Sequence, residues 1–115
     1  MPLLKITTST DPSPENDKLL ANLSRLVADR LGKPESYVMT AIEHPARMTF
    51  AGSTAPTCYV EVKNIGRFTP EQTQRLSAEI CERLSAGLGV PKDRIYIEFA
   101  DVDAYLWGHD GDTFA

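Results

Sequence analysis

The sequence predicts an α+β fold in which duplicated β-α-β units form a four-stranded sheet with two helices on one face. The first observation is an internal repeat: L-G-K-P-E-S-Y-V at 31–38 returns as L-G-V-P-K-D-R-I at 88–95, and S-P-E at 13–15 returns as T-P-E at 69–71. The second is hydrophobic patterning, which has a helical spacing inside each repeat and a period of two at its ends. Matches at several landmarks of one unit indicate an internal duplication.

The repeat also sets the domain organisation that we expect. The first strand, P-L-L-K-I-T from Pro2, corresponds to C-Y-V-E-V-K from Cys58. The two copies therefore cover about 1–50 and 58–103. At this length the chain makes one domain, 1–115, which is large enough to bury a core but leaves no room for a second.

Two helices are expected, and they have matching start and stop signals. Ser13 and Thr69 are candidate N-caps, and each precedes a proline at the first helical position. Gly32 and Gly89 are candidate helix ends, each followed two residues later by a proline. The apolar stripes between these signals consist of Leu19, Leu20, Leu23, Leu26, Val27 and Leu31 in the first helix and of Leu76, Ile80, Leu84 and Leu88 in the second.

The sheet strands are expected at 3–7 and in three segments where apolar and polar residues alternate. Additional short strands are expected near Met48–Phe50 and Ala104–Trp107. The residues of the alternating strands that should lie under the helices are Val38, Thr40, Ile42, Cys58, Val60, Val62, Ile95, Ile97 and Phe99.

The opposite face of the sheet is mixed in polarity. It carries Tyr59, Glu61 and Lys63 on one strand and Tyr96 and Glu98 on another. A sheet with helices on only one side must solvate its other face or bury it against partners. We expect self-association through this face, since a closed oligomer also removes exposed strand edges.

Composition excludes several classes of function. The net charge of −4 offers no basic face to offset phosphate repulsion, so no nucleic-acid partner is expected. No apolar run is long enough to cross a bilayer, and the charged chain start does not resemble a signal peptide. We therefore expect no membrane partner and a cytoplasmic location, or secretion by a leaderless route. Cys58 and Cys81 are expected to be free thiols, and with His44 and His109 isolated from them no metal site is predicted.

Pro2 is the first candidate catalytic residue. Initiator methionine is normally removed when the second residue is small, and its removal would leave a secondary amine at the chain start. Burial lowers the pKa of such an amine, and a neutral amine near pH 7 can take a proton from the carbon next to a carbonyl. The alternative is that the proline only sets processing and begins a strand.

The other candidate residues each have two interpretations. Lys33 stands where the second repeat has Val90, so the shared fold does not require a cation there. Lys33 is either a favourable charge at a helix C-terminus or an anchor for a substrate carboxylate. The loop at 63–68 either offers amides to an anionic substrate or simply turns the chain. Tyr96 with Glu98 either completes a site across a subunit boundary or belongs to a solvated or interfacial strand face.

The sequence resembles a known family, the macrophage migration inhibitory factor family of the tautomerase superfamily, over essentially the whole chain. The resemblance lies in Met1-Pro2, L-G-K-P at 31–34, M-T-F-A-G-S at 48–53, N-I-G-R at 64–67, R-I-Y-I-E-F at 94–99 and T-F-A at 113–115. It implies a homotrimer whose three sheets form a barrel. It also implies keto–enol tautomerase activity, without a cofactor, on small aromatic α-keto acids such as phenylpyruvate or on dopachrome-type compounds.

The resemblance further implies a role for each candidate residue. Pro2 is the general base once the initiator methionine is removed, Lys33 binds the substrate carboxylate, and the backbone near Ile65 adds hydrogen bonds. Tyr96 comes from the neighbouring subunit and lines the pocket. Glu98 departs from the asparagine of the vertebrate cytokine members. A carboxylate there would repel an anionic substrate, raise the pKa of Pro2 or serve as a proton donor.

Two non-enzymatic interpretations stay open. A signalling or binding protein of this family, with a protein receptor as partner, would keep the pocket without using it physiologically. A plain α+β interaction module of ferredoxin-like topology would need neither Pro2 nor Lys33. The stretch at 57–60 reads T-C-Y-V. The CxxC pair of the cytokine is therefore absent, and no thiol oxidoreductase role is expected.

Overall fold

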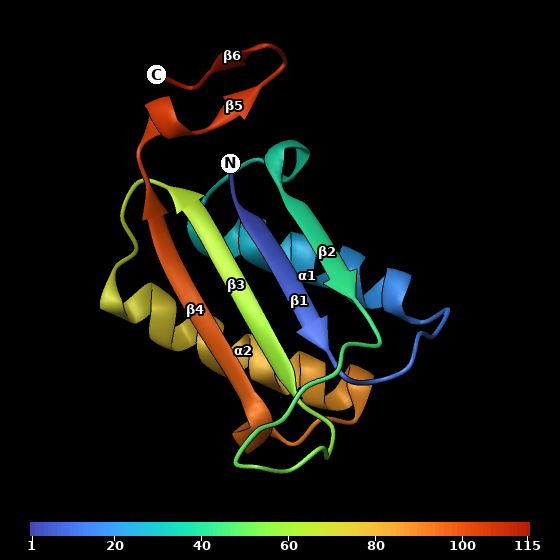
Figure 1. Cartoon of the computed structure of the whole chain (residues 1–115). Coiled ribbons are helices and arrows are strands. Elements are labelled where there is room, and N and C mark those ends of the chain that lie inside the picture. The colour runs from blue at the N-terminus through green and yellow to red at the C-terminus, as the bar shows by residue number, and fades with distance from the viewer.

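The two β-α-β units share one sheet in the computed structural model, which describes residues 1–115. The first unit consists of β1 (Leu3–Thr8), α1 (Asn16–Leu31) and β2 (Met39–Glu43), and the second of β3 (Cys58–Ile65), α2 (Pro70–Leu88) and β4 (Ile95–Val102). The strand order is β2-β1-β3-β4. The two strands of each unit are parallel, and β1 pairs antiparallel with β3 at the centre (Figure 1). Two helices and a mixed four-stranded sheet are therefore confirmed.

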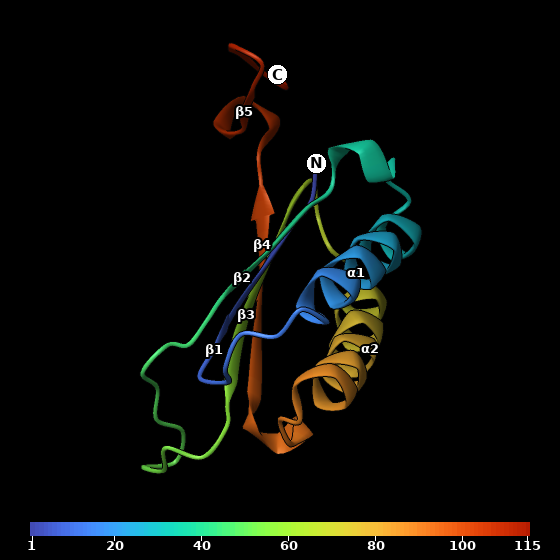
Figure 2. The same ribbon diagram turned by 90° about the vertical axis from the view of Figure 1, so that its right-hand side faces the viewer.

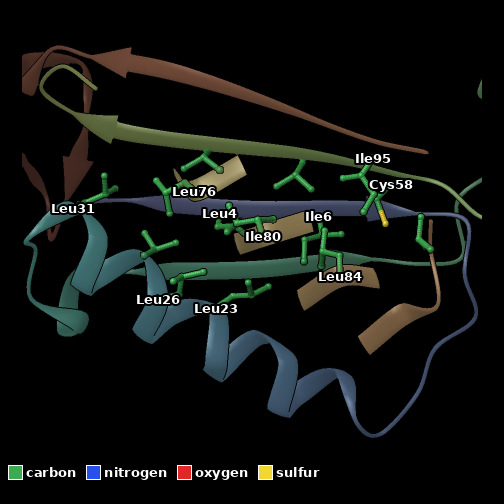
Figure 3. Close-up of a cluster of buried hydrophobic side chains, with 14 residues drawn as sticks. Leu4, Ile6, Leu23, Leu26, Leu31, Cys58, Leu76, Ile80, Leu84 and Ile95 are labelled. Atoms are coloured by element: carbon green, nitrogen blue, oxygen red, sulfur yellow. The ribbon is translucent and has the colours of Figure 1, made fainter. Parts of the chain in front are cut away.

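Both helices lie on one face of the sheet, and the other face is uncovered (Figure 2). The residues expected to face the helices do so: Val60 and Val62 are fully buried, and the hydroxyl of Thr40 donates to the carbonyl of Leu20 at 3.3 Å. The core fills the space between the layers (Figure 3). Its buried members are Leu4, Ile6, Leu23, Leu26, Val27, Leu31, Cys58, Val60, Val62, Leu76, Ile80, Leu84, Val90 and Ile95.

The segment after β4 differs from the prediction. Residues Ala104–Leu106 form a 3-10 helix, η3, rather than a strand, because the amides of Leu106 and Trp107 bond back to carbonyls three residues earlier. A short hairpin of β5 (Gly108–His109) and β6 (Asp112–Thr113) follows. In Figure 1 this hairpin projects beyond the end of the sheet at which the chain begins.

The strand predicted near Met48–Phe50 is also wrong. Phe50 and Ser53 exchange two backbone hydrogen bonds of 3.0 Å, which closes a tight turn. Ala51 and Gly52 within the turn both have positive φ, of 52° and 72°. The chain therefore pairs with itself here instead of joining the sheet.

Helix ends agree with the sequence at three of four signals. Thr69 is the N-cap of α2, where its hydroxyl and the Gln72 side chain form a reciprocal capping box. Gly32 and Gly89 end the two helices in the left-handed conformation. Ser13 is not an N-cap. Its carbonyl and hydroxyl instead accept the amides of the next turn, and α1 begins only at Asn16, without a side-chain cap.

This difference predicts unequal effects of two similar substitutions. Thr69→Ala is expected to lower the free energy of unfolding by about 1 kcal/mol, because a helix amide loses its acceptor. Ser13→Ala, at an exposed turn, is expected to change it by less than ~0.5 kcal/mol. Urea unfolding at one protein concentration measures both. Equal losses in the two variants would contradict the assignment of only one cap.

Candidate active site

Pro2 immediately precedes β1 and is buried. Its carbonyl accepts the amide of Met39 at 3.0 Å, which continues the pairing of β1 with β2. A proline lacks an amide hydrogen, so this site leaves no donor unsatisfied. The chain begins at Met1 in the structure, and the nitrogen of Pro2 is therefore an amide there. It becomes a basic amine only when Met1 is removed.

A cavity of about 390 Å³ opens beside Pro2. Three aromatic rings form one part of its wall. The rings of His109 and Phe114 are stacked, with their centroids 5.6 Å apart. The ring of Tyr37 is edge-on to both, with centroid distances of 6.0 Å. The complete wall consists of Met1, Pro2, Leu3, Ser36, Tyr37, Val38, Met39, Trp107, Gly108, His109 and Phe114. Such a largely apolar hollow with a few polar groups suits a small aromatic ligand.

Lys33 is placed by the end of α1. The amides of Gly32 and Lys33 both bond to the carbonyl of Ala28, which closes the helix and sends the chain toward the cavity. The side chain of Lys33 is half-buried and joins none of the five ion pairs of the chain. Its repeat counterpart, Val90, is fully buried in the core. The same backbone position thus supports packing in one copy and leaves a free cation in the other.

The charge environment of the chain start favours a neutral amine. The pKa of the Met1 amino group is lowered, first because burial disfavours the ammonium and second because the positive charge of Lys33 repels it. Met1 is only half-buried, whereas Pro2 is buried. An amine on Pro2 would meet the same two influences with less exposure to water. Both influences favour the neutral, basic form of such an amine.

Ile65 lies at the same end of the sheet as Pro2. It ends β3, and Lys63, two residues earlier, pairs with Leu3 of β1. Ile65 is half-buried, and its side chain does not line the cavity. The structure thus brings Pro2, Lys33 and Ile65 to one end of the fold.

Tyr96 and Glu98 lie away from Pro2 in the same chain. In the sheet register Tyr96 is level with Thr7, and Glu98 is level with Lys5. Tyr96 is therefore five residues from Pro2, about 16 Å along the strand at ~3.3 Å per residue, and two strand spacings across. It is 66% exposed. One chain alone cannot place Tyr96 against Pro2.

Glu98 has a partner that the sequence did not indicate. The hydroxyl of Tyr59 donates a hydrogen bond of 2.6 Å to Oε1 of Glu98. This bond is the main cause that raises the pKa of Tyr59 to about 12, with smaller contributions from burial and from the charges of Glu98 and Glu61. The bond fixes one carboxylate oxygen and turns the Glu98 side chain across the open face.

The Tyr59 pKa predicts a late phenol titration. Of the four tyrosines, one should ionise near pH 12, about two units above the ordinary value of ~10. Because the neutral phenol is favoured in the folded state, its stabilising effect is present below pH ~10 and is lost as the pH rises through 12. Absorbance at alkaline pH, with circular dichroism to verify folding, measures this. Glu98→Ala should abolish most of the delay and Glu61→Ala little of it; equal effects would contradict the assigned cause.

The sequence did not identify the aromatic wall. Tyr37 follows the first helix, whereas His109 and Phe114 belong to the last eight residues. They meet because η3 and the β5-β6 hairpin return the chain tail to its start. Neither a repeat nor a periodicity marks these positions. The nearest sequence signal is the T-F-A ending at 113–115, which belongs to the family resemblance but predicts no contact with Tyr37.

Metal and thiol chemistry have no built site here. No group of three or more His, Cys, Asp or Glu side chains is arranged to hold a metal ion. Cys58 and Cys81 are both free, and burial raises the pKa of each thiol. Thiols held in the protonated form are poor nucleophiles.

No helix is both long and apolar enough to cross a membrane.

Comparisons with family models, with related sequences and with solved structures all give the same family. The family model described as macrophage migration inhibitory factor (MIF) matches residues 1–115. The macrophage migration inhibitory factor homolog of Trichuris trichiura is 34% identical over 114 residues, which cover 99% of this chain and 100% of the relative. The macrophage migration inhibitory factor of Xenopus tropicalis is 31% identical over 115 residues, 100% of both chains. The crystal structure of the homologue from Prochlorococcus marinus has 48% identity and a TM-score of 0.95, covering 98% of this chain and 99% of that one.

Proposed function

The chain belongs to the macrophage migration inhibitory factor family, and on that premise we propose that it is a keto–enol tautomerase whose base is the amine of Pro2. The observation that carries this proposal is the position of Pro2. It is a buried residue at the chain start beside an aromatic-lined cavity, and the pKa of the adjoining Met1 amino group is lowered by burial and by the charge of Lys33.

The chemistry follows from these groups. The neutral amine of Pro2 takes a proton from the carbon next to the keto group of the substrate, and the electron pair of that C–H bond forms the C=C bond of the enol. The ammonium of Pro2 then returns this proton to the carbonyl oxygen, so that the substrate is isomerised without loss or gain of atoms and the amine is neutral again. The ammonium of Lys33 holds the substrate carboxylate, and the stacked rings of His109 and Phe114 hold its aromatic ring. No cofactor takes part in this reaction.

The proposed site is completed by a second copy of the chain in a homotrimeric barrel. Tyr96 is exposed and lies far from its own Pro2, so it is free to reach the cavity of a neighbour. Glu98, two residues on, lies on the same open face with one oxygen bound to Tyr59. The other oxygen makes no hydrogen bond within the chain and would face the substrate or the neighbouring base. Burial of this mixed face in an oligomer also accounts for a sheet without helices on that side.

Tautomerisation of phenylpyruvate tests the proposal. The protein should be one whose mass confirms loss of Met1 and whose oligomeric state is measured in the same buffer. The expected result is conversion between enol and keto forms well above the buffer rate. An inactive enzyme with an intact oligomer would instead favour a binding or signalling role for the same pocket.

A further inference from the structure

The segment that joins β2 to β3 is long and lacks a core of its own. It spans 44–57, and none of its residues before Thr57 is buried. Connections of about this length without regular structure are uncommon in small domains and are usually functional or disordered. The ends of the segment bond to the end of β1, where the amide of Ala46 donates to the carbonyl of Thr8 and the amide of Thr57 donates to the hydroxyl of Ser9. Its middle part is held by one side chain.

That side chain is Arg94, which immediately precedes β4. Its guanidinium donates four hydrogen bonds to carbonyl oxygens of the segment: from Nε to Pro56 at 2.9 Å, from Nη1 to Phe50 at 3.1 Å, and from Nη2 to Ser53 at 3.1 Å and Ala55 at 3.0 Å. An arginine has five such donors in a rigid fork, and lysine cannot reproduce this arrangement. The half-buried guanidinium also lies 5.3 Å from the centre of the Phe50 ring.

The segment in turn supports Tyr96. The rings of Phe50 and Tyr96 are 4.7 Å apart and inclined by 53°. Tyr96 contacts no other aromatic ring, and its hydroxyl makes no hydrogen bond within the chain. At 66% exposure little else limits its orientation. The contacts therefore run from Arg94 through Phe50 to Tyr96.

We propose that Arg94 is a positioning residue for the active site of the neighbouring subunit, and that it acts by holding Phe50 against Tyr96. The inference rests on the proposed tautomerase function, in which Tyr96 lines the neighbour's pocket. Arg94 itself touches neither substrate nor base. Its substitution should therefore weaken substrate binding by the adjacent subunit and leave the base of its own subunit unchanged.

The substitution of Arg94 is expected to change KM and to leave kcat nearly unchanged. Arg94→Ala should raise KM for phenylpyruvate about 3- to 10-fold, the range expected when one aromatic contact is lost, while kcat changes less than about twofold. Phe50→Leu should reproduce the rise, because it removes the ring but retains the four hydrogen bonds. Guanidinium ion added to Arg94→Ala should lower KM again. Arg83→Ala is the matched control, since the Arg83 guanidinium donates its one side-chain hydrogen bond to Asn22, and it should leave KM unchanged.

Mixed oligomers show in which subunit Arg94 acts. Arg94→Ala and Pro2→Gly chains are unfolded together at equal amounts and refolded. In a ring of three, about a quarter of the sites then combine an intact Pro2 with a neighbour that has an intact Arg94. The mixture should show a component with wild-type KM at roughly that fraction of wild-type activity. A mixture of Arg94→Ala with the double variant Pro2→Gly, Arg94→Ala should lack it.

The outcomes separate the two claims. An inactive wild type contradicts the proposed function. An active wild type with unchanged KM in both Arg94→Ala and Phe50→Leu overturns the role of Arg94. A raised KM without the wild-type component in the mixed oligomer shows that Arg94 acts within its own subunit, and also overturns it. If Arg94→Ala does not assemble, Phe50→Leu mixed with Pro2→Gly gives the same test.

Discussion

Pro2→Gly is expected to lower kcat/KM for phenylpyruvate about 100-fold. A positioned general base contributes roughly 10² to 10⁴ in rate. Glycine at the chain start still carries an amine, so part of this contribution is retained. It lacks the ring that the fold buries, and its backbone is freer. The amine therefore spends little time in the orientation that removes the proton.

The measurement is steady-state tautomerisation by wild type and variant, both with Met1 shown by mass to be absent. Pro14→Gly is the matched control, because Pro14 lies in an exposed turn before α1 and should leave the activity unchanged. An equal loss in both variants would point to the fold and not to the base. Full activity in Pro2→Gly would exclude Pro2 as the base.

Lys33→Ala is expected to have the second largest effect, through substrate binding. A hydrogen bond to a charged group is worth about 1.5–3 kcal/mol, or roughly a 10- to 150-fold rise in KM for an anionic substrate. The pKa of the amine at the chain start should also rise, because Lys33, which after burial is the second cause that lowers the pKa of the Met1 amino group, is gone. Since only the neutral amine acts as base, the rising limb of the pH–rate profile should move to higher pH.

Lys18→Ala provides the control for Lys33. Lys18 is an exposed lysine of the same helix, with its ammonium 3.5 Å from the carboxylate of Glu15. It should change neither KM nor the pH profile. A rise in KM for Lys33→Ala without any movement of the pH limb would show that Lys33 binds substrate but lies too far from the base to influence it.

Local signals in the sequence predicted the scaffold well. Gly32 and Gly89 ended the helices as expected, because the left-handed conformation at these positions favours glycine. Thr69 capped α2 because Gln72 stands at the position that completes the reciprocal box. Ser13 has the same neighbouring proline but no such partner, and a turn uses its hydroxyl and carbonyl first. In this chain the N-cap therefore depends on the residue three positions after the hydroxyl residue as much as on the hydroxyl residue itself.

The candidate site was only partly predictable. Pro2 and Lys33 could be found because one is at the chain start and the other breaks the repeat at the counterpart of the core residue Val90. His109 and Phe114 contact Tyr37 because the C-terminal segment folds back to the end of the sheet where the chain begins. The strand expected at 104–107 is a 3-10 turn, and that turn redirects the tail. No local pattern records such a return.

The most direct test of the Pro2 assignment compares two forms of the unaltered sequence, with Met1 retained and with Met1 removed. Inhibition of methionine aminopeptidase during expression provides the first form, and mass spectrometry identifies both. Every pocket side chain from Pro2 onward is identical in the two forms, and only the second has a basic nitrogen on Pro2. Phenylpyruvate tautomerisation is predicted for the form without Met1 and near-background rates for the other. Equal rates from the two forms would contradict the assignment of Pro2 as the base.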